Sequence, residues 1–164
     1  MTDAMATLVE RHRSRGVLVD TNILLLLFVG SFDRDRIPRF KRTQQFTVAD
    51  FDRLTHVLSC FARIVTTPNI LSEVNSLSGQ LGEPDRARYF ADFAGRIDLL
   101  DERYVPSKSA AAAPEFRRLG LTDSVILQLG KERLLVLTDD VPLYHYLEKA
   151  GVDVINFNHV RDLG

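Results

Sequence analysis

Short apolar runs that alternate with helical patterns restrict the fold of this chain more than any other sequence feature. Continuous apolar strands are typical of parallel sheets, in which helices cover both faces. The sequence therefore predicts an α/β fold, a three-layer α/β/α sandwich with a central, mainly parallel sheet. The runs predicted to be strands lie at residues 17–20, 63–67, 134–138 and 152–155.

Between these runs, apolar residues recur at the spacing of an α-helix. Thr47 followed by Asp50 three positions later predicts a capping box at one helix start. Thr122 is predicted to cap a later helix, whereas residues 105–121 fit either a short helix or a loop. The remaining helices are predicted over 22–29, 68–77, 84–100 and 142–149.

Length and composition exclude several classes of protein. A chain of 164 residues can bury a sizeable core without a disulfide or metal to hold it. The single cysteine, Cys60, excludes a disulfide framework and a cysteine-rich zinc site. The longest apolar stretch, residues 23–29, is far shorter than a membrane span requires. We expect a cytoplasmic protein with no membrane partner.

Five acidic residues are predicted to lie near one edge of the sheet. Asp20 ends the first strand, and Asp139 and Asp140 directly follow a later strand. Glu73 falls in the helix after the second strand, and Asp123 falls in the first turn of another helix. Ligands of open parallel sheets bind outside the carboxyl ends of the strands. That edge is therefore the candidate functional site.

Each of these acids also has a purely structural explanation. Asp20 could cap a helix, Asp123 could complement a helix dipole, and Glu73 could simply be solvated. Asp139 and Asp140 could belong to a turn. All five acids together favour a functional site over these separate explanations. Carboxylates that converge raise one another's pKa, and such a cluster is usually kept because a cation neutralises it. An all-oxygen ligand set favours Mg²⁺ or Mn²⁺ over zinc.

The acids lie in four motifs that occur in a fixed order. These are a hydrophobic strand followed by Asp-Thr-Asn at 17–22, a helical Glu within 67–74, an Asp that opens a helix within 120–126, and a strand followed by Thr-x-Asp within 135–140. Together they resemble the PIN-domain nucleases, the family of the VapC-type toxins and of several RNA-processing nucleases. The resemblance implies one PIN-like domain over 1–164, with a core at about 17–156, a lead-in at 1–15 and a basic excursion at 31–46.

The resemblance also implies roles for individual residues. Asp140 holds the last position of Thr-x-Asp, so Asp139 would be an additional ligand or an acid that supports one. Asn22 and Thr138 would orient carboxylates and water. Catalysis and metal binding would belong to Asp20, Glu73, Asp123 and Asp140.

The implied activity is hydrolysis of RNA phosphodiester bonds by a Mg²⁺- or Mn²⁺-dependent endoribonuclease. Its implied partners are RNA, a second copy in a homodimer, and an antitoxin or other protein if the chain is the toxin of a toxin–antitoxin pair. The alternative is a catalytically weak PIN fold that binds RNA or protein. A receiver domain or a dehalogenase-type phosphatase is disfavoured, because Thr66-Thr67 and Asn22 stand where those families need aspartates.

A formal net charge of −1 gives no overall basic character that would indicate a nucleic-acid binder. The net charge is a sum, however, and can conceal a basic region. Residues 1–42 hold eight basic and five acidic residues, so the rest of the chain is the acidic part. The basic cluster is expected either to contact the phosphate backbone of RNA or to form a solvated loop partly paired with Asp33 and Asp35. Its members are Arg34, Arg36, Arg39, Lys41 and Arg42.

Overall fold

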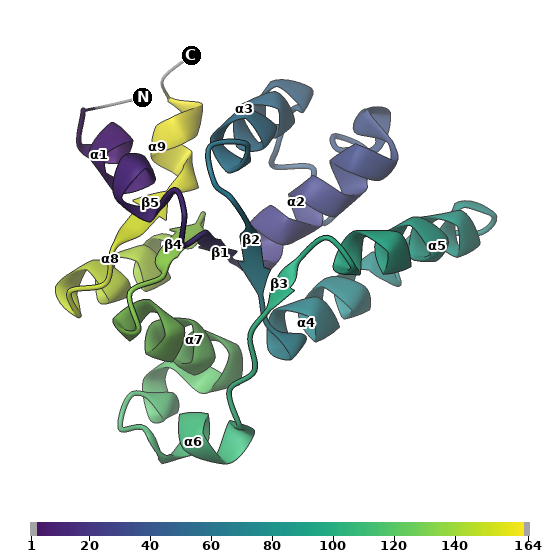
Figure 1. Ribbon diagram of the computed structural model, residues 1–164. Coiled ribbons are helices and arrows are strands. Elements are labelled where there is room, and N and C mark those ends of the chain that lie inside the picture. Colours follow the sequence, from purple (N-terminus) through teal and green to yellow (C-terminus); the bar gives the residue numbers. More distant parts are fainter. Residues whose placement is uncertain (1–2, 163–164) are drawn as a thin grey trace.

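A computed structural model describes residues 3–162 of the chain and has a five-stranded, all-parallel sheet at its centre (Figure 1). The strand order is β3-β2-β1-β4-β5, so the first strand lies in the middle. Helices flank the sheet, which confirms the expected α/β/α architecture. The strands are β1 (Val17–Val19), β2 (Ile64–Thr66), β3 (Asp101–Glu102), β4 (Leu135–Thr138) and β5 (Val154–Asn156).

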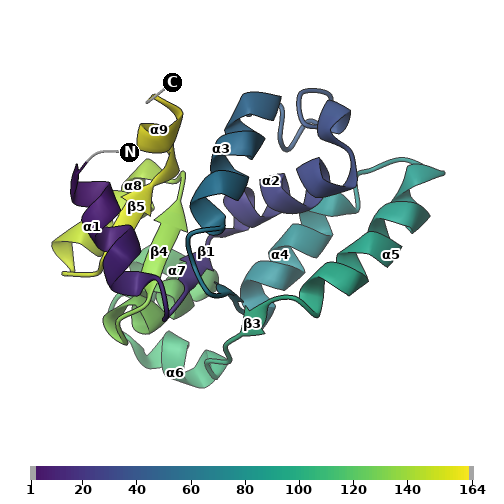
Figure 2. The same cartoon turned by 45° about the horizontal axis from the view of Figure 1, so that its top comes forward.

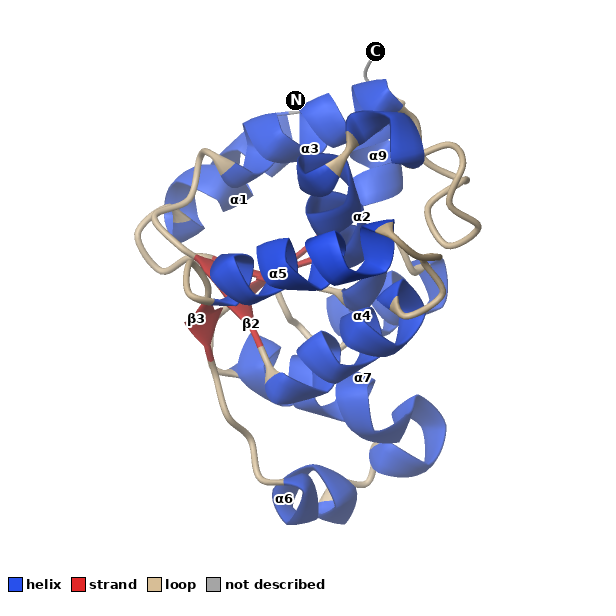
Figure 3. Ribbon diagram, turned by 90° about the vertical axis from the view of Figure 1, so that its right-hand side faces the viewer, coloured by secondary structure: helices blue, strands red, loops and turns tan. Residues whose placement is uncertain are grey.

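Helices make up most of the molecule and enclose the short strands (Figure 3). In Figure 1, α3 and α9 lie on one side of the sheet and α7 lies on the other. The α-helices are α1 (Asp3–His12), α2 (Thr21–Phe32), α3 (Val48–Leu58), α4 (Pro68–Ser78), α5 (Asp85–Ile97), α6 (Ser107–Ala112), α7 (Phe116–Lys131), α8 (Val141–Lys149) and α9 (Phe157–Arg161). A 3₁₀ turn, η1, covers Arg34–Arg36.

The core is built on the two central strands and on α2. All residues of β1 and β4 are buried, as continuous apolar strands require. Helix α2 is apolar on nearly every side, and a helix of that kind is stable only when it is surrounded. It packs against α3, α4 and α5 (Figure 2). This packing fixes the start of α2, at Asp20, relative to the sheet.

Several predicted boundaries are confirmed and others are wrong. The Thr47–Asp50 capping box is present at the start of α3. Strand β3 was not expected, because its two residues are acidic and carry no apolar pattern. Helix α9 lies where only a polar tail was expected. Within the described part of the chain, none of the helices has the length and hydrophobicity to cross a membrane.

Candidate functional site at the carboxyl edge of the sheet

Asp20 is the most deeply buried of the predicted acids. It directly follows β1 and caps α2, with its Oδ1 accepting the backbone N–H of Thr21 at 2.6 Å. Its Oδ2 accepts the hydroxyl of Thr138 at 2.6 Å. Burial raises the pKa of Asp20 to about 6, although both hydrogen bonds oppose the shift. The carboxylate is therefore fixed in orientation and costly to ionise.

Thr138 connects two of the predicted site residues. It is the last residue of β4, the strand beside β1, and it is fully buried. Besides donating to Asp20, its Oγ1 accepts the backbone N–H of Asp140 at 3.0 Å. Asp140 in turn caps α8, with its Oδ1 accepting the N–H of Leu143 at 2.8 Å. One threonine hydroxyl thus sets the relative positions of Asp20 and Asp140.

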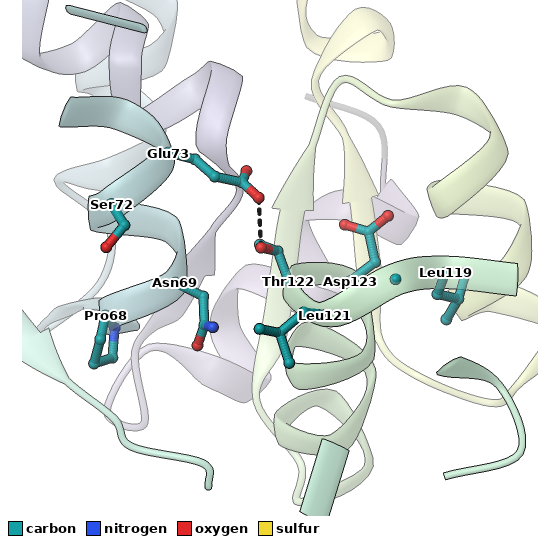
Figure 4. Close-up of a pocket in the computed structure, with 9 residues that line it drawn as sticks. Pro68, Asn69, Ser72, Glu73, Leu119, Leu121, Thr122 and Asp123 are labelled. Atoms are coloured by element: carbon teal, nitrogen blue, oxygen red, sulfur yellow. Dashed lines mark hydrogen bonds between the residues drawn. The ribbon is translucent and has the colours of Figure 1, made fainter. Parts of the chain in front are cut away.

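Glu73 is held by two threonines from other helices. Its Oε2 accepts the hydroxyl of Thr21 at 2.7 Å, and its Oε1 accepts the hydroxyl of Thr122 (Figure 4). The sequence did not indicate either contact, since the partners lie about fifty residues away along the chain. A helical segment does begin after the kink at Gly120, close to the predicted start, but Thr122 does not cap it, because its hydroxyl donates to Glu73.

Asp123 follows Thr122 in α7, and its pKa is affected by the other acids of this edge. Its pKa is raised to about 7, first by burial and then by the negative charges of Asp20, Asp140 and Glu73. Asp123 is therefore close enough to three acids from other segments for their charges to act on it. Their proximity agrees with the common edge expected for these residues, and their role as a site stays a prediction.

Asp139 shares this edge but has a different environment. Burial raises the pKa of Asp139, and the Asn22 side chain partly opposes that shift. Its Oδ1 is buried and has no hydrogen-bond partner among residues 3–162. Buried carboxylate oxygens usually have a partner, so this atom is available to accept from a donor or to ligate a cation. Asn158, which the sequence did not single out, donates to the Asp139 backbone carbonyl at 2.9 Å.

An open cleft of about 650 Å³ lies between α4 and α7, beside Glu73 and Asp123 (Figure 4). Gly120 interrupts α7 there with a φ of +75°, a conformation that suits glycine. The kink turns Leu119, Leu121 and Thr122 toward the cleft. The full lining is Pro68, Asn69, Ser72, Glu73, Leu119, Gly120, Leu121, Thr122 and Asp123.

The acids are suited to a divalent cation by charge and by donor type. However, no three His, Cys, Asp or Glu side chains in the described range form a group that could hold a metal ion as they stand. Glu73 and Asp20 instead direct their oxygens at hydroxyl and N–H donors. The mutual pKa effects and the unpartnered Oδ1 of Asp139 fit a cation site, and the ligand roles stay predictions.

The basic segment, residues 31–46, was expected to be an excursion from the core, but it packs against the core. Ile37, Phe40 and Phe46 are buried, so residues 31–46 contribute to the core. Arg34 pairs with Asp52 of α3 at 2.5 Å.

Two further cations of this segment are also engaged. Arg36 pairs with Asp85 of α5 and with Asp33. Pairing with Asp33 was expected if the segment were a solvated loop. Arg42 donates to Gln80 at 3.1 Å. Of the five cations predicted to contact RNA, Arg39 and Lys41 are the two whose side chains have no hydrogen bond or ion pair among the described residues.

Comparison of the chain with protein-family models gives no match, and comparison with curated proteins gives none either. The case for a function therefore depends on the geometry of this chain alone.

Proposed function

We propose that this chain is a metal-dependent endoribonuclease of the PIN-domain type. One observation carries the proposal: Glu73 of α4 is held by hydroxyls of α2 and α7, so that it faces the same edge as Asp20 and Asp123. Maintaining this many carboxylates in mutual repulsion is unfavourable unless a cation or a proton compensates them. Binding of a divalent cation would offset the repulsion and would explain why these carboxylates lie close together.

The proposed ligands of Mg²⁺ or Mn²⁺ are Asp20, Glu73, Asp123 and Asp140, with Asp139 as an additional ligand. When bound, such an ion lowers the pKa of coordinated water and neutralises charge on the phosphoryl oxygens. Thr138 and Thr21 orient two of these carboxylates. Without a cation, the pKa of Asp123 is raised to about 7, and a bound divalent ion would favour its ionised, ligand form.

The proposed substrate is single-stranded or loop RNA, which can enter the open cleft between α4 and α7. The proposed location is the cytoplasm, where the unpaired Cys60 would stay reduced. An antitoxin, another protein or a second copy are proposed partners.

One observation favours a second candidate, a catalytically weak module that binds RNA or protein. It is that the acids in the described residues do not stand in metal-holding positions. This candidate predicts RNA binding without turnover.

Cleavage of a long single-stranded RNA in Mn²⁺ separates the two candidates. The wild-type protein should cleave the RNA, and cleavage should stop when a chelator removes the Mn²⁺. Asp20→Asn and Asp123→Asn should each lose about a hundredfold or more in rate, because each removes a proposed ligand. The exposed Asp98→Asn is the matched control and should cleave normally. Unchanged cleavage in both site variants would overturn the assignment, and RNA binding without any cleavage would favour the second candidate.

A further inference from the structure

A second cleft, of about 330 Å³, lies at the opposite edge of the sheet from the carboxylates. Three of its arginines come from segments that lead into strands: Arg15 precedes β1, Arg63 precedes β2, and Arg133 precedes β4. Arg103 follows β3 and completes the set. We propose that this arginine cleft, formed by Arg15, Arg63, Arg103 and Arg133, binds a phosphate-bearing anion.

Two of the four arginines are fixed by one carboxylate. Asp101 Oδ2 accepts Arg63 Nη1 at 3.3 Å and Arg103 Nη2 at 3.0 Å. The backbone N–H of Arg103 also donates to the carbonyl of Thr66 at 2.8 Å, which ties this residue to β2. One carboxylate shared by two guanidinium groups orders them and leaves an excess of positive charge.

Arg15 is brought beside this pair by the tight turn that enters β1. The next residue, Gly16, has a φ of +97°, and a Cβ there would lie 2.5 Å from the Cγ of Arg63. Val17 N–H donates to the Arg63 carbonyl at 3.2 Å. Only glycine allows this approach, so the turn holds the Arg15 and Arg63 segments in contact. The backbone N–H of Arg15 donates to the His12 carbonyl at 3.0 Å, whereas its side chain has no hydrogen bond or ion pair within residues 3–162.

Arg133 occupies a backbone position that favours glycine. Its N–H donates to the Gly130 carbonyl and that of Leu134 to the Leu129 carbonyl, the Schellman pattern that ends α7. Arg133 has a φ of +71° and is the one non-glycine residue with positive φ in the described part of the chain. Glycine is the usual residue at this point, so an arginine here retains its side chain at a conformational cost. That cost is explained if the side chain has a ligand.

The shape of the cleft favours phosphate over an acidic peptide. Planar guanidinium groups match the oxygens of phosphate in pairs. Four arginines and one carboxylate, Glu132, line this small concavity, so its net charge is positive and suits a compact, multiply charged anion, whereas an extended peptide needs a longer groove. The phosphate can belong to a free phosphoanion or to a nucleic-acid strand, and the test has an arm for each.

Calorimetric titration in EDTA tests the proposal without any metal or cleavage. The probes are inorganic pyrophosphate, a short 5′-phosphorylated single-stranded RNA and an oligoglutamate peptide. Arg15→Gln and Arg133→Gly should each weaken phosphate binding about tenfold, as expected for loss of a charged hydrogen-bond donor. Arg88→Gln, on α5, is the control and should bind normally. Arg133→Gly should keep or raise the melting temperature, because glycine suits the positive φ.

Weakened pyrophosphate binding in the variants would identify a free phosphoanion as a sufficient ligand. An effect on RNA alone would identify the strand. The proposal is overturned if neither phosphate probe binds, if the variants bind like the wild type, or if the oligoglutamate alone binds. Because the measurement needs no metal and concerns the other edge of the sheet, its failure leaves the proposed nuclease activity untouched.

Discussion

The two edges of one short sheet carry opposite charges. Aspartates directly follow β1 and β4 at the carboxyl edge, and arginines lie one or two residues before β1, β2 and β4 at the amino edge. Strands of three or four residues separate the edges by only about 10–13 Å. A net charge of −1 therefore results from two local fields of opposite sign and says little about what the protein binds.

The edges also differ in how their charges are held. At the carboxyl edge, hydroxyl groups of Thr21, Thr122 and Thr138 orient Glu73 and Asp20. At the amino edge, the carboxylate of Asp101 orders two arginines, and the side chains of Arg15 and Arg133 have no hydrogen bond or ion pair among the described residues. The carboxylates of the first edge are thus engaged by donors of the protein itself, whereas two arginine side chains of the second are not engaged within the described chain.

The largest stability effect is expected from the hydroxyl that organises the carboxyl edge. Thr138→Val leaves the buried Oδ2 of Asp20 without a donor, so the free energy of unfolding should fall by about 1–3 kcal/mol. RNA cleavage should fall with it, since Asp20 loses its orientation. Chemical denaturation and a cleavage assay measure the two effects.

Thr66→Val is the matched control for that prediction. Thr66 ends the neighbouring strand β2 and is equally buried, but its hydroxyl has no hydrogen-bond partner in the described chain. The same substitution should therefore leave stability unchanged or raise it. Equal losses in the two variants would show that the Thr138 hydroxyl has no special role.

The raised pKa values of this edge predict how stability depends on pH. Asp20 and Asp123 have pKa values of about 6 and about 7 in the folded protein, against 3.8 for an ordinary Asp. Between about pH 4 and pH 7 the folded state thus binds more protons than the unfolded state, and stability falls as pH rises. The metal-free protein should be more stable at pH 5 than at pH 8.

Asp123→Asn should flatten this profile. After allowance for partial exposure, it should raise the free energy of unfolding at pH 8 by about 1–2 kcal/mol. Denaturation series at the two pH values measure the slope, with Asp98→Asn as the control. A wild type that gains stability from pH 5 to pH 8 would contradict the electrostatic description.

A smaller effect is expected from the kink in α7. Gly120→Ala and Gly151→Ala both place a side chain at a φ of +75° with open space around it, so each should cost about 1–2 kcal/mol, and Gly120→Ala should cost more because its ψ of −171° is a conformation nearly restricted to glycine. Only Gly120→Ala should also slow RNA cleavage, because the kink turns residues of α7 into the acidic cleft. Equal cleavage rates in the two variants would show that the kink at Gly120 has no role in the site.

The smallest effect is expected from the basic segment. Replacing Arg39, Lys41 and Arg42 with Ala should weaken RNA binding a few-fold and reduce its salt dependence, leaving metal binding intact. The effect is modest because this segment does not adjoin the acidic cleft in its lining residues. Binding isotherms at several salt concentrations test it. A loss as large as that of the arginine-cleft variants would reverse the ranking of the two basic regions.

The sequence predicted best where local rules determine structure. The continuous apolar runs gave the parallel strands, and the Thr47–Asp50 pair gave its capping box. The carboxyl-edge acids were placed because residues that end parallel strands must share an edge.

What the sequence did not predict depends on long-range contacts. The hydroxyls that hold Glu73 come from two distant helices, and Thr122 carries the local pattern of a cap. The pairing of Arg36 with Asp85 links segments with no shared periodicity. The arginine cleft was missed for the same reason, since its members are scattered along the chain and meet only in the folded protein.

Titration of Mn²⁺ into the metal-free protein tests the central claim most directly, because it needs no substrate. The wild type should bind Mn²⁺, Asp123→Asn should bind it about tenfold or more weakly, and Asp98→Asn should match the wild type. Failure of the wild type to bind Mn²⁺, or equal affinity in all three proteins, would contradict the assignment of a metal site to the carboxyl edge of the sheet.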